Sequence, residues 1–260
     1  MTFSANLGFL FTDLSLPDRI RAAKAAGFDA VECHFPYETP VQEVLAALQE
    51  TGLAMLGLNT SPGNLAAGDF GLAALTGREE EARAAIEMAV DYAEAIGAGN
   101  VHVMAGKTDG GAGANATFRE NLGHACDLAA KSGINILIEP INHRDVPGYH
   151  LSLVEQAADI IEALGRPNLK LMFDCYHTQI MQGDLTERLR RYMDIIGHIQ
   201  IAAVPDRGEP DAGEVHFPNL IAAIREYGFT GPIGAEYKPR GSSTEAGLGW
   251  LSAFRKQKAQ

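Results

Sequence analysis

The chain has 260 residues, of which 46% are hydrophobic and 21% are charged, as is usual for a globular domain. Its net charge of -12 argues against a nucleic-acid partner, which needs a surplus of Lys and Arg, and against adhesion to an anionic membrane surface. A small anionic substrate stays compatible with this charge, because a site can be locally positive. The three cysteines form neither a CxxC motif nor a disulfide framework.

Residues 1–260 are expected to form one domain, because no linker, low-complexity segment or change in composition divides them. The first apolar run begins near Ser4, which leaves no room for a signal peptide. No apolar run is long enough to span a bilayer. We therefore expect a cytoplasmic protein.

The chain repeats one pattern, which is an amphipathic stretch of helical length, a glycine and then a short apolar run. The glycines lie where a left-handed residue would end a helix, at Gly27, Gly52, Gly97, Gly133, Gly165, Gly197 and Gly228. The apolar runs are typical of parallel strands buried on both faces. They cover residues 4–10, 31–36, 53–60, 100–106, 135–141, 169–174, 198–203 and 232–237.

Eight strands that alternate with helices predict an α/β fold, a closed (β/α)₈ TIM barrel. A doubly wound open sheet is the alternative. It would usually carry a glycine-rich phosphate loop after the first strand, and ANLGFLFTDLS at residues 5–15 is not such a loop.

Four of the later strands carry oxygen-bearing side chains at or near their carboxyl ends, namely Glu139, Asp174, Gln200 and Glu236. In a closed barrel these ends meet at the face where such barrels keep their active sites. Three buried carboxylates repel one another unless a cation neutralises them. An all-oxygen cage suits Mg²⁺ or Mn²⁺ better than zinc. The sequence therefore predicts a metal-dependent enzyme. The alternative is that each acid pairs with a nearby base, such as Lys170, Lys238 or Arg207.

Several side chains close to the strand ends are candidates for substrate binding. His177 follows Asp174 by three residues, and His143 lies just after the fifth strand. Arg207 and Glu209, in the loop after the seventh strand, are expected to lie over the barrel mouth as substrate-binding candidates. Arg207 could hold a carboxylate with two hydrogen bonds, or it could pair with Glu209 and stiffen that loop. Lys238 is a further cationic candidate at the end of the eighth strand.

Other polar residues are expected to be structural. His102 and His198 lie within strands and read as core residues, and Glu32 and Lys170 could pair in the barrel floor. The segment at residues 61–81 is too long for a plain connection, so it is interpreted as a lid over the barrel mouth or as a surface flap.

With these residues in view, the chain resembles the hydroxypyruvate isomerase family of the xylose isomerase-like barrel superfamily. The similarity runs nearly from end to end, through GFDAVECHFPY, LIEPINHRDVPGYHL, FDCYHTQIMQGDL and GHIQIAAVPDRGEPDAGEV. The resemblance implies a (β/α)₈ barrel with a metal position lined by Glu139, Asp174, Gln200 and Glu236. It also implies that Glu139 and Glu236 are the acid/base pair.

A sister group within this family acts on 2-oxo-tetronates, and the segments LNTSPGNLAAGDFGLAAL and YKPRGSSTEAGLGW resemble it, whereas IEPINHRDVPGYHL resembles hydroxypyruvate isomerase. The resemblance thus implies an intramolecular oxidoreductase that interconverts ketose and aldose acids, with a small 2-oxo acid as its substrate. Hydroxypyruvate and 2-oxo-tetronate (2-dehydrotetronate) stay as alternatives.

Three more distant functions are disfavoured by particular features of the sequence. Related sugar epimerases carry a His where this chain has Gln200, and a metal-dependent endonuclease would need more histidines and a basic face. Acids at the strand ends argue against a non-catalytic sugar-acid binding protein. The sequence leaves the oligomeric state open, although barrels of this size often form homo-oligomers.

Overall fold

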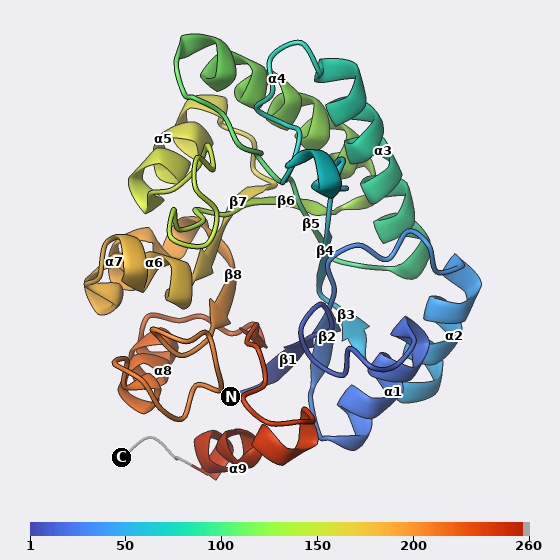
Figure 1. The fold of residues 1–260 in the computed structure, drawn as a ribbon, viewed down its shortest axis with the longest axis vertical. Helices are drawn as coiled ribbons and strands as arrows, with labels where there is room; N and C mark the ends of the chain where they lie inside the picture. Colours follow the sequence, from blue (N-terminus) through green and yellow to red (C-terminus); the bar gives the residue numbers. More distant parts are fainter. Residues whose placement is uncertain (257–260) are drawn as a thin grey trace.

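Parallel strands form a ring, and the helices pack around its outside (Figure 1). The computed structural model describes residues 1–256. Within them the strands follow the order β3-β2-β1-β9-β8-β7-β6-β5-β4, and the paired neighbouring strands run parallel. The strands are β1 (Phe3–Asn6), β2 (Ala30–Glu32), β3 (Ala54–Met55), β4 (Gly57–Asn59), β5 (Asn100–His102), β6 (Asn135–Ile138), β7 (Leu169–Asp174), β8 (Ile196–Ile201) and β9 (Ile233–Ala235).

The third strand of the predicted barrel is divided into two short pieces. β3 pairs with β2 on one side, and β4 pairs with β5 on the other. Two backbone hydrogen bonds join the end of β2 to β4, from Cys33 N to Gly57 O at 3.1 Å and from Asn59 N to His34 O at 2.8 Å. These bonds close the ring between the two ends of the sheet, so the predicted TIM barrel is confirmed.

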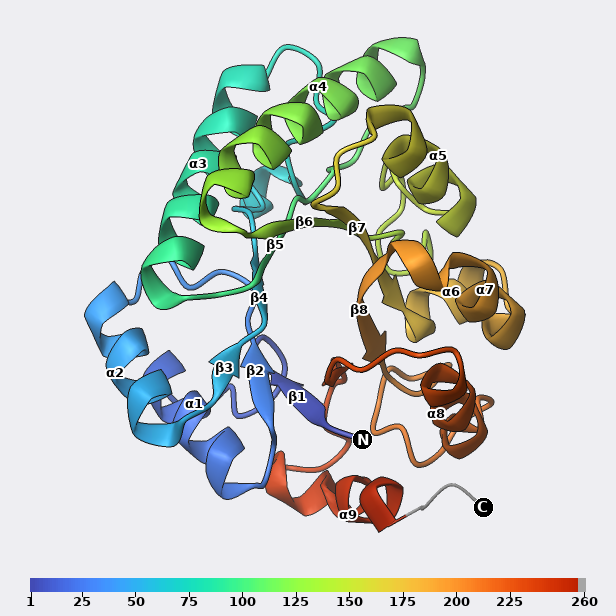
Figure 2. The same cartoon turned by 180° about the vertical axis from the view of Figure 1, so that it is seen from behind.

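The helices lie on the outside of the ring in both views (Figure 2). Each of the long helices has a buried face, as in α3 (Glu79–Ile96) and α5 (Val154–Leu164). A parallel connection needs a crossover segment, which the helices provide. They are α1 (Leu16–Ala25), α2 (Val41–Thr51), α3 (Glu79–Ile96), α4 (Ala112–Ala129), α5 (Val154–Leu164), α6 (Cys175–Met181), α7 (Leu185–Tyr192), α8 (Phe217–Glu226) and α9 (Gly249–Lys256), with short 3₁₀ turns at Leu65–Ala67, Ala130–Ser132, Met193–Ile195 and Glu245–Gly247. Among residues 1–256, no helix has the length and the apolar character needed to cross a membrane.

Gly197 is the one glycine of the predicted pattern that does not follow a helix in a left-handed conformation. The other six have positive φ, whereas Gly197 lies inside β8. A Cβ there would lie 2.7 Å from Lys170 Cβ on the neighbouring strand. The prediction of a helix stop is therefore wrong at this position, because the glycine is needed for the close approach of β7 and β8.

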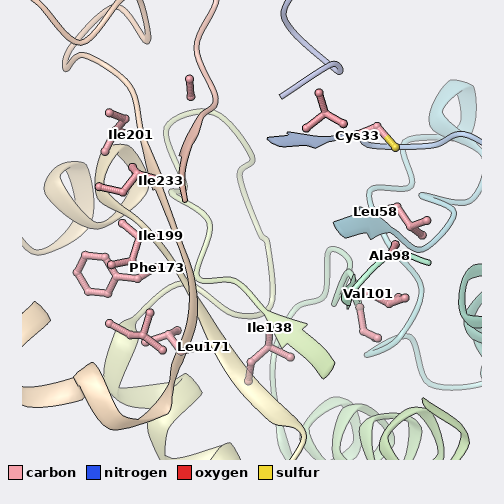
Figure 3. Close-up of a cluster of buried hydrophobic side chains, with 14 of the residues drawn as sticks. Cys33, Leu58, Ala98, Val101, Ile138, Leu171, Phe173, Ile199, Ile201 and Ile233 are labelled. Atoms are coloured by element: carbon pink, nitrogen blue, oxygen red, sulfur yellow. The ribbon is translucent and has the colours of Figure 1, made fainter. Parts of the chain in front are cut away.

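Alternation along the strands divides their side chains between two environments. Phe173 on β7 is in register with Ile199 on β8, and both belong to the fully buried apolar cluster (Figure 3). The intervening Met172, His198 and Gln200 line a cavity inside the barrel. Burying an aliphatic or aromatic side chain contributes roughly 1.5–3 kcal/mol, so the outer layer fixes which residues point inward.

Candidate active site

Three of the four predicted oxygen ligands converge with a histidine at the carboxyl ends of the strands. Glu139 follows β6, Asp174 ends β7, Glu236 follows β9 and His177 lies in α6. One ligand atom from each of these four buried residues lies within 4.8 Å of those of the others. Gln200, the fourth predicted ligand, is in register with Asp174 on the adjacent strand β8.

The donor set contains oxygens that no protein group satisfies. Within residues 1–256, Glu139 Oε1, Asp174 Oδ2 and Gln200 Oε1 are buried and have no hydrogen-bond partner. Leaving a buried polar group unpaired costs about 1–3 kcal/mol, and more for a charged group. Such atoms are rare in native structures. Three of them belong to the predicted ligand set, so the residues present fit a divalent cation that prefers oxygen ligands, such as Mg²⁺ or Mn²⁺.

Asp174 divides its two oxygens between structure and site. Its Oδ1 accepts hydrogen bonds from Tyr176 N at 2.6 Å and His177 N at 3.4 Å, which caps the amino end of α6. The other oxygen, Oδ2, is the unpartnered one and lies 3.7 Å from His177 Nε2. The cap fixes the carboxylate plane, so Oδ2 is held toward the cluster.

The tautomer of His177 makes it a hydrogen-bond donor toward the cluster. The backbone N–H of Asn142 donates to His177 Nδ1 at 3.3 Å, so this nitrogen must be an acceptor. Burial and then the charge of Arg207 lower the pKa of His177 to about 3, so the ring is neutral at pH 7. Its proton therefore sits on Nε2, which lies 3.8 Å from Glu139 Oε1. In this state His177 Nε2 can donate a hydrogen bond to a carboxylate or a substrate oxygen. It cannot bind a metal ion, because a metal ligand needs a free lone pair on that nitrogen.

Arg207 and Glu236 form an ion pair at the mouth of the barrel. Arg207 Nη2 donates to Glu236 Oε2 at 2.7 Å and lies 3.8 Å from Asp174 Oδ2. The guanidinium carbon lies 4.9 Å from the ring centroids of both Phe9 and Tyr176. Stacking between two rings orients the planar guanidinium, and Lys could not reproduce that arrangement.

The three carboxylates have different protonation preferences. Burial, followed by the charges of Glu236 and Asp174, raises the pKa of Glu139 well above its usual value. Burial and then Glu236 raise the pKa of Asp174 to about 8. Burial also raises the pKa of Glu236, but Arg207 and the hydrogen bond from His34 outweigh it and hold this pKa below the usual range. Adjacent carboxylates with pKa values pushed apart are typical of acid/base pairs.

Three residues of this cluster, Glu139, His177 and Glu236, line a cavity together with Arg207. Its empty volume is ≈590 Å³, which includes solvent at its mouth. The rest of the lining is mostly apolar and aromatic, and includes Phe9, Phe35, Phe70, Met104, Ile141 and Val146. A concave, mostly apolar pocket with a few convergent polar groups is typical of a small-molecule site. Phe70 comes from the segment at residues 61–81, so part of that segment does border the mouth.

Three of the predicted substrate-binding residues lie outside the lining of this cavity. His143 is exposed and its Nε2 lies 3.1 Å from Tyr149 O. Lys238 is exposed, and its backbone N–H donates to Arg207 O at 2.8 Å. It therefore stabilises the loop that carries Arg207 and does not line the cavity. Glu209 is buried and pairs with Arg240 at 3.3 Å. The alternative pairing of Arg207 with Glu209 is therefore not formed.

The barrel floor differs from the expected pairing of Glu32 with Lys170. His198 Nε2 lies 2.5 Å from Glu32 Oε2 instead. Burial lowers the pKa of His198, but the Glu32 carboxylate outweighs burial and raises it. Lys170 shares a face with Met172 and Asp174 but lies near the start of β7, where its alkyl chain lies close to Gly197. His198 on β8 is therefore the ionisable partner of Glu32 in the structure.

Two residues that contact Glu236 were not singled out from the sequence. Asn6 Nδ2 donates to Glu236 Oε1 at 2.9 Å, and His34 Nε2 lies 3.1 Å from the same oxygen. A Cβ at Gly8 would lie 2.2 Å from His34 Nδ1, so the glycine makes room for this ring. Alternation from Glu32 would have placed His34 on the inward face of its strand, and that signal could have found it.

Comparisons with known proteins agree with this geometry. A family model described as xylose isomerase-like TIM barrel matches residues 20–254. The chain belongs to the xylose isomerase-like TIM barrel family. Within this family it is 47% identical to the 2-oxo-tetronate isomerase of Cupriavidus necator over 97% of this chain and 98% of the relative. It is 41% identical to the hydroxypyruvate isomerase of Escherichia coli over 98% of this chain and 100% of the relative.

A solved structure has nearly the same fold as this chain. The crystal structure of AP endonuclease, family 2 from Brucella melitensis superposes with a TM-score of 0.93 at 39% identity and covers 97% of this chain and 98% of that one. The resemblance inferred from the sequence is confirmed, and the curated relatives named isomerases confirm that the chain is an isomerase.

Proposed function

We propose that this isomerase acts on a small 2-oxo hydroxy acid and converts hydroxypyruvate into tartronate semialdehyde. The observation that carries the proposal is the pair of buried glutamates, Glu139 and Glu236, which line one cavity from different strands beside unpartnered oxygens. The hydroxypyruvate isomerase of Escherichia coli, which matches along its whole length, supports the choice of substrate.

The reaction exchanges two functional groups between adjacent carbons. Hydroxypyruvate carries a ketone at C2 and a hydroxyl at C3, and the product carries a hydroxyl at C2 and an aldehyde at C3. One proton leaves C3 and another leaves the C3 hydroxyl, an ene-diolate spans C2 and C3, and one proton returns to C2 and one to the C2 oxygen. The atoms and electrons balance without an external oxidant or reductant, so the site needs groups that accept and donate protons.

The cation position of the proposal is formed by Glu139, Asp174, Gln200 and Glu236. A divalent cation there would supply positive charge for the developing ene-diolate oxygens, an effect worth several kcal/mol. The unpartnered oxygens of three of these residues support this position. Oxygen atoms are hard ligands, which Mg²⁺ and Mn²⁺ prefer, so they also support the choice of metal.

The remaining roles follow from the contacts of each side chain. Glu139 and Glu236 accept and return the proton, which typically contributes roughly 10²–10⁴-fold to the rate. His177 presents its Nε2 proton to a substrate oxygen. Arg207, stacked between two rings, holds the substrate carboxylate with its planar donors.

A turnover screen tests the proposal. The purified protein is given hydroxypyruvate and 2-oxo-tetronate separately in D₂O, with and without a chelator, and NMR follows both the product and the exchange of carbon-bound protons. We expect turnover and exchange of hydroxypyruvate that the chelator abolishes. Binding without any exchange would contradict the proposed chemistry.

The second candidate substrate is 2-oxo-tetronate. It is favoured by the 47% identity to the Cupriavidus necator relative of that name. The same proton transfers convert this four-carbon acid, so the two candidates differ in the fit of one additional carbon in the cavity. A higher kcat/KM for 2-oxo-tetronate in the screen would assign it as the substrate.

A further inference from the structure

Glu32 is the centre of a polar network beneath the proposed cation position. Four side chains from two other strands, β1 and β8, point their donors at its carboxylate: His198 Nε2 at 2.5 Å, Gln200 Nε2 at 2.9 Å, Asn6 Nδ2 at 3.1 Å and Ser4 Oγ at 3.2 Å. Glu32 is 4% exposed, so these contacts replace water around a buried charge. The position of the carboxylate is therefore fixed from several sides.

The hydrogen bond to Gln200 determines which end of its carboxamide faces the cluster. A carboxylate with four donors around it can only accept, so the atom of Gln200 that meets Glu32 Oε1 is the amide nitrogen. The amide oxygen must then lie on the other side. That oxygen, Oε1, is buried and unpartnered within residues 1–256, and Gln200 neighbours Asp174 in the sheet.

Gly234 leaves the space in which this contact forms. It lies in β9 in register with Gln200. A Cβ at this position would lie 2.7 Å from Glu32 Oε1 and 2.9 Å from Gln200 Cγ, so any side chain there would force Glu32 or Gln200 to move. The absence of a side chain at Gly234 thus allows the Glu32–Gln200 contact to form.

Asn6 extends the network to a second member of the proposed cation position. Its Nδ2 lies 3.1 Å from Glu32 Oε1 and 2.9 Å from Glu236 Oε1. Its Oδ1 accepts from Gly8 N at 2.9 Å, which fixes the amide and leaves the nitrogen between the two carboxylates. Glu32 and Glu236 are therefore connected through one side chain.

We propose that Glu32 is a positioning residue that sets the Gln200 carboxamide with its oxygen toward the cation and, through Asn6, braces Glu236. This inference rests on the cation of the proposed function and deepens it. Groups that orient metal ligands in this way typically contribute roughly 10–100-fold to metal affinity. Glu32 touches neither substrate nor cation, so its effect passes through Gln200 and Glu236.

The test compares Mn²⁺ affinity with fold stability in three variants. In Glu32→Gln the new amide can present its nitrogen to residue 200, so the Gln200 amide can turn and offer nitrogen to the cation. We expect Mn²⁺ to bind about 10–100-fold more weakly, measured by calorimetry and by the EPR signal of free Mn²⁺. Ser4→Ala is the matched control, because it removes a donor to Glu32 Oε2 and leaves Gln200 untouched; its Mn²⁺ affinity is expected to equal that of the wild type.

The exchanged pair, Glu32→Gln with Gln200→Glu, provides the rescue. The amide at position 32 then donates to the carboxylate at position 200, whose second oxygen faces the cation, so most of the lost affinity is expected to return. Urea unfolding of each protein without metal shows how much of any change is loss of folded protein.

Each outcome separates this inference from the proposed function. Wild-type Mn²⁺ affinity in Glu32→Gln, or equal losses in Glu32→Gln and Ser4→Ala, would overturn the positioning role and leave the proposed function standing. A wild-type protein that binds no Mn²⁺ or Mg²⁺ would overturn the cation position and this inference together. Turnover of the 2-oxo acid in the wild type reports on the substrate independently of both.

Discussion

The Arg207 guanidinium donates a 2.7 Å hydrogen bond to the Glu236 carboxylate, although the two residues come from a loop after β8 and from the end of β9. The backbone of the same loop is held by Lys238, whose N–H donates to Arg207 O at 2.8 Å. Arg207 has a positive φ of 57°, a conformation that costs a non-glycine residue energy and that surrounding contacts must maintain. The hydrogen bond therefore joins Arg207, which is proposed to bind the substrate carboxylate, to Glu236, which is a proposed acid/base residue.

Arg207→Lys is expected to lower kcat/KM for the 2-oxo acid by roughly 10–100-fold, because Lys keeps the charge but loses the planar donors and the stacking on Phe9 and Tyr176. Steady-state kinetics measure this change. The exposed Arg190→Lys, which pairs with Glu187 on the surface, is the matched control and should behave as wild type. Unchanged kcat/KM in Arg207→Lys would remove Arg207 from substrate binding.

Glu139→Gln and Glu236→Gln are each expected to lower kcat by roughly 10²–10⁴-fold, because an amide cannot accept the transferred proton. Proton exchange of the substrate with D₂O should fall in parallel, and the circular dichroism spectrum should not change. Glu38→Gln, an exposed carboxylate in the loop after β2, is the control. Near wild-type turnover in either variant would eliminate the two-glutamate scheme.

Removing divalent cations with a chelator is expected to abolish turnover, and adding Mn²⁺ or Mg²⁺ should restore it. Added cation should also stabilise the fold, by about 2.7 kcal/mol at 100 times its Kd, because it binds only the folded protein. Asp174→Asn should lose this stabilisation, since the unpartnered Oδ2 would no longer carry charge. Thermal melts with increasing Mn²⁺ provide the measurement, and a cation-independent melting temperature in the wild type would contradict the site.

His198→Leu is expected to lower the free energy of unfolding by about 3–5 kcal/mol, because it leaves the buried Glu32 carboxylate without its positively charged histidine partner. His198 has a raised pKa when folded, so its contribution is complete below its unfolded value of 6.5 and is lost as pH rises through the folded pKa. Burial raises the pKa of Glu32, but His198 outweighs burial and lowers it. The contribution of Glu32 to stability is therefore complete above its unfolded pKa of 4.5 and is lost as pH falls through its folded pKa.

The difference in unfolding free energy between wild type and His198→Leu should therefore be greatest between pH 4.5 and 6.5. Urea unfolding of the metal-free proteins across this range measures it. His124→Leu is the control, since its partly exposed ring pairs with Glu87 on the surface, and its effect should stay within about 0.5 kcal/mol. A difference that does not vary with pH would show that His198 and Glu32 are not an ion pair.

The similarity to the Brucella melitensis structure named AP endonuclease, family 2 gives a last prediction. DNA with an abasic site should not be cleaved in the presence of Mg²⁺ or Mn²⁺, because a chain with a net charge of -12 has little attraction for phosphates. Gel analysis of the DNA at low salt, where binding is strongest, is the measurement. Cleavage that Asp174→Asn abolishes would assign the site a nuclease activity.

The sequence determined the barrel and the level of the site within it. Alternation and glycine-terminated helices are local signals, and they predicted eight strands in the order that the structure shows. Counting along each strand also predicted that Glu139, Asp174 and Glu236 meet at the carboxyl ends, because parallel strands in one ring share that edge. Gly197 shows the limit of the local signal, since a close approach between strands and a helix stop can both require glycine.

Only the tertiary structure decided how those residues are oriented and paired. Asn6 and Glu236 are 230 positions apart and meet only because β1 and β9 are neighbours in the closed ring. The pairing of Glu209 with Arg240, of Glu32 with His198, and the turn of the Gln200 amide depend in the same way on contacts across strands and loops. Periodicity fixes the face on which a side chain lies, whereas its hydrogen-bond partners are fixed by distances that exist only after the ring has closed.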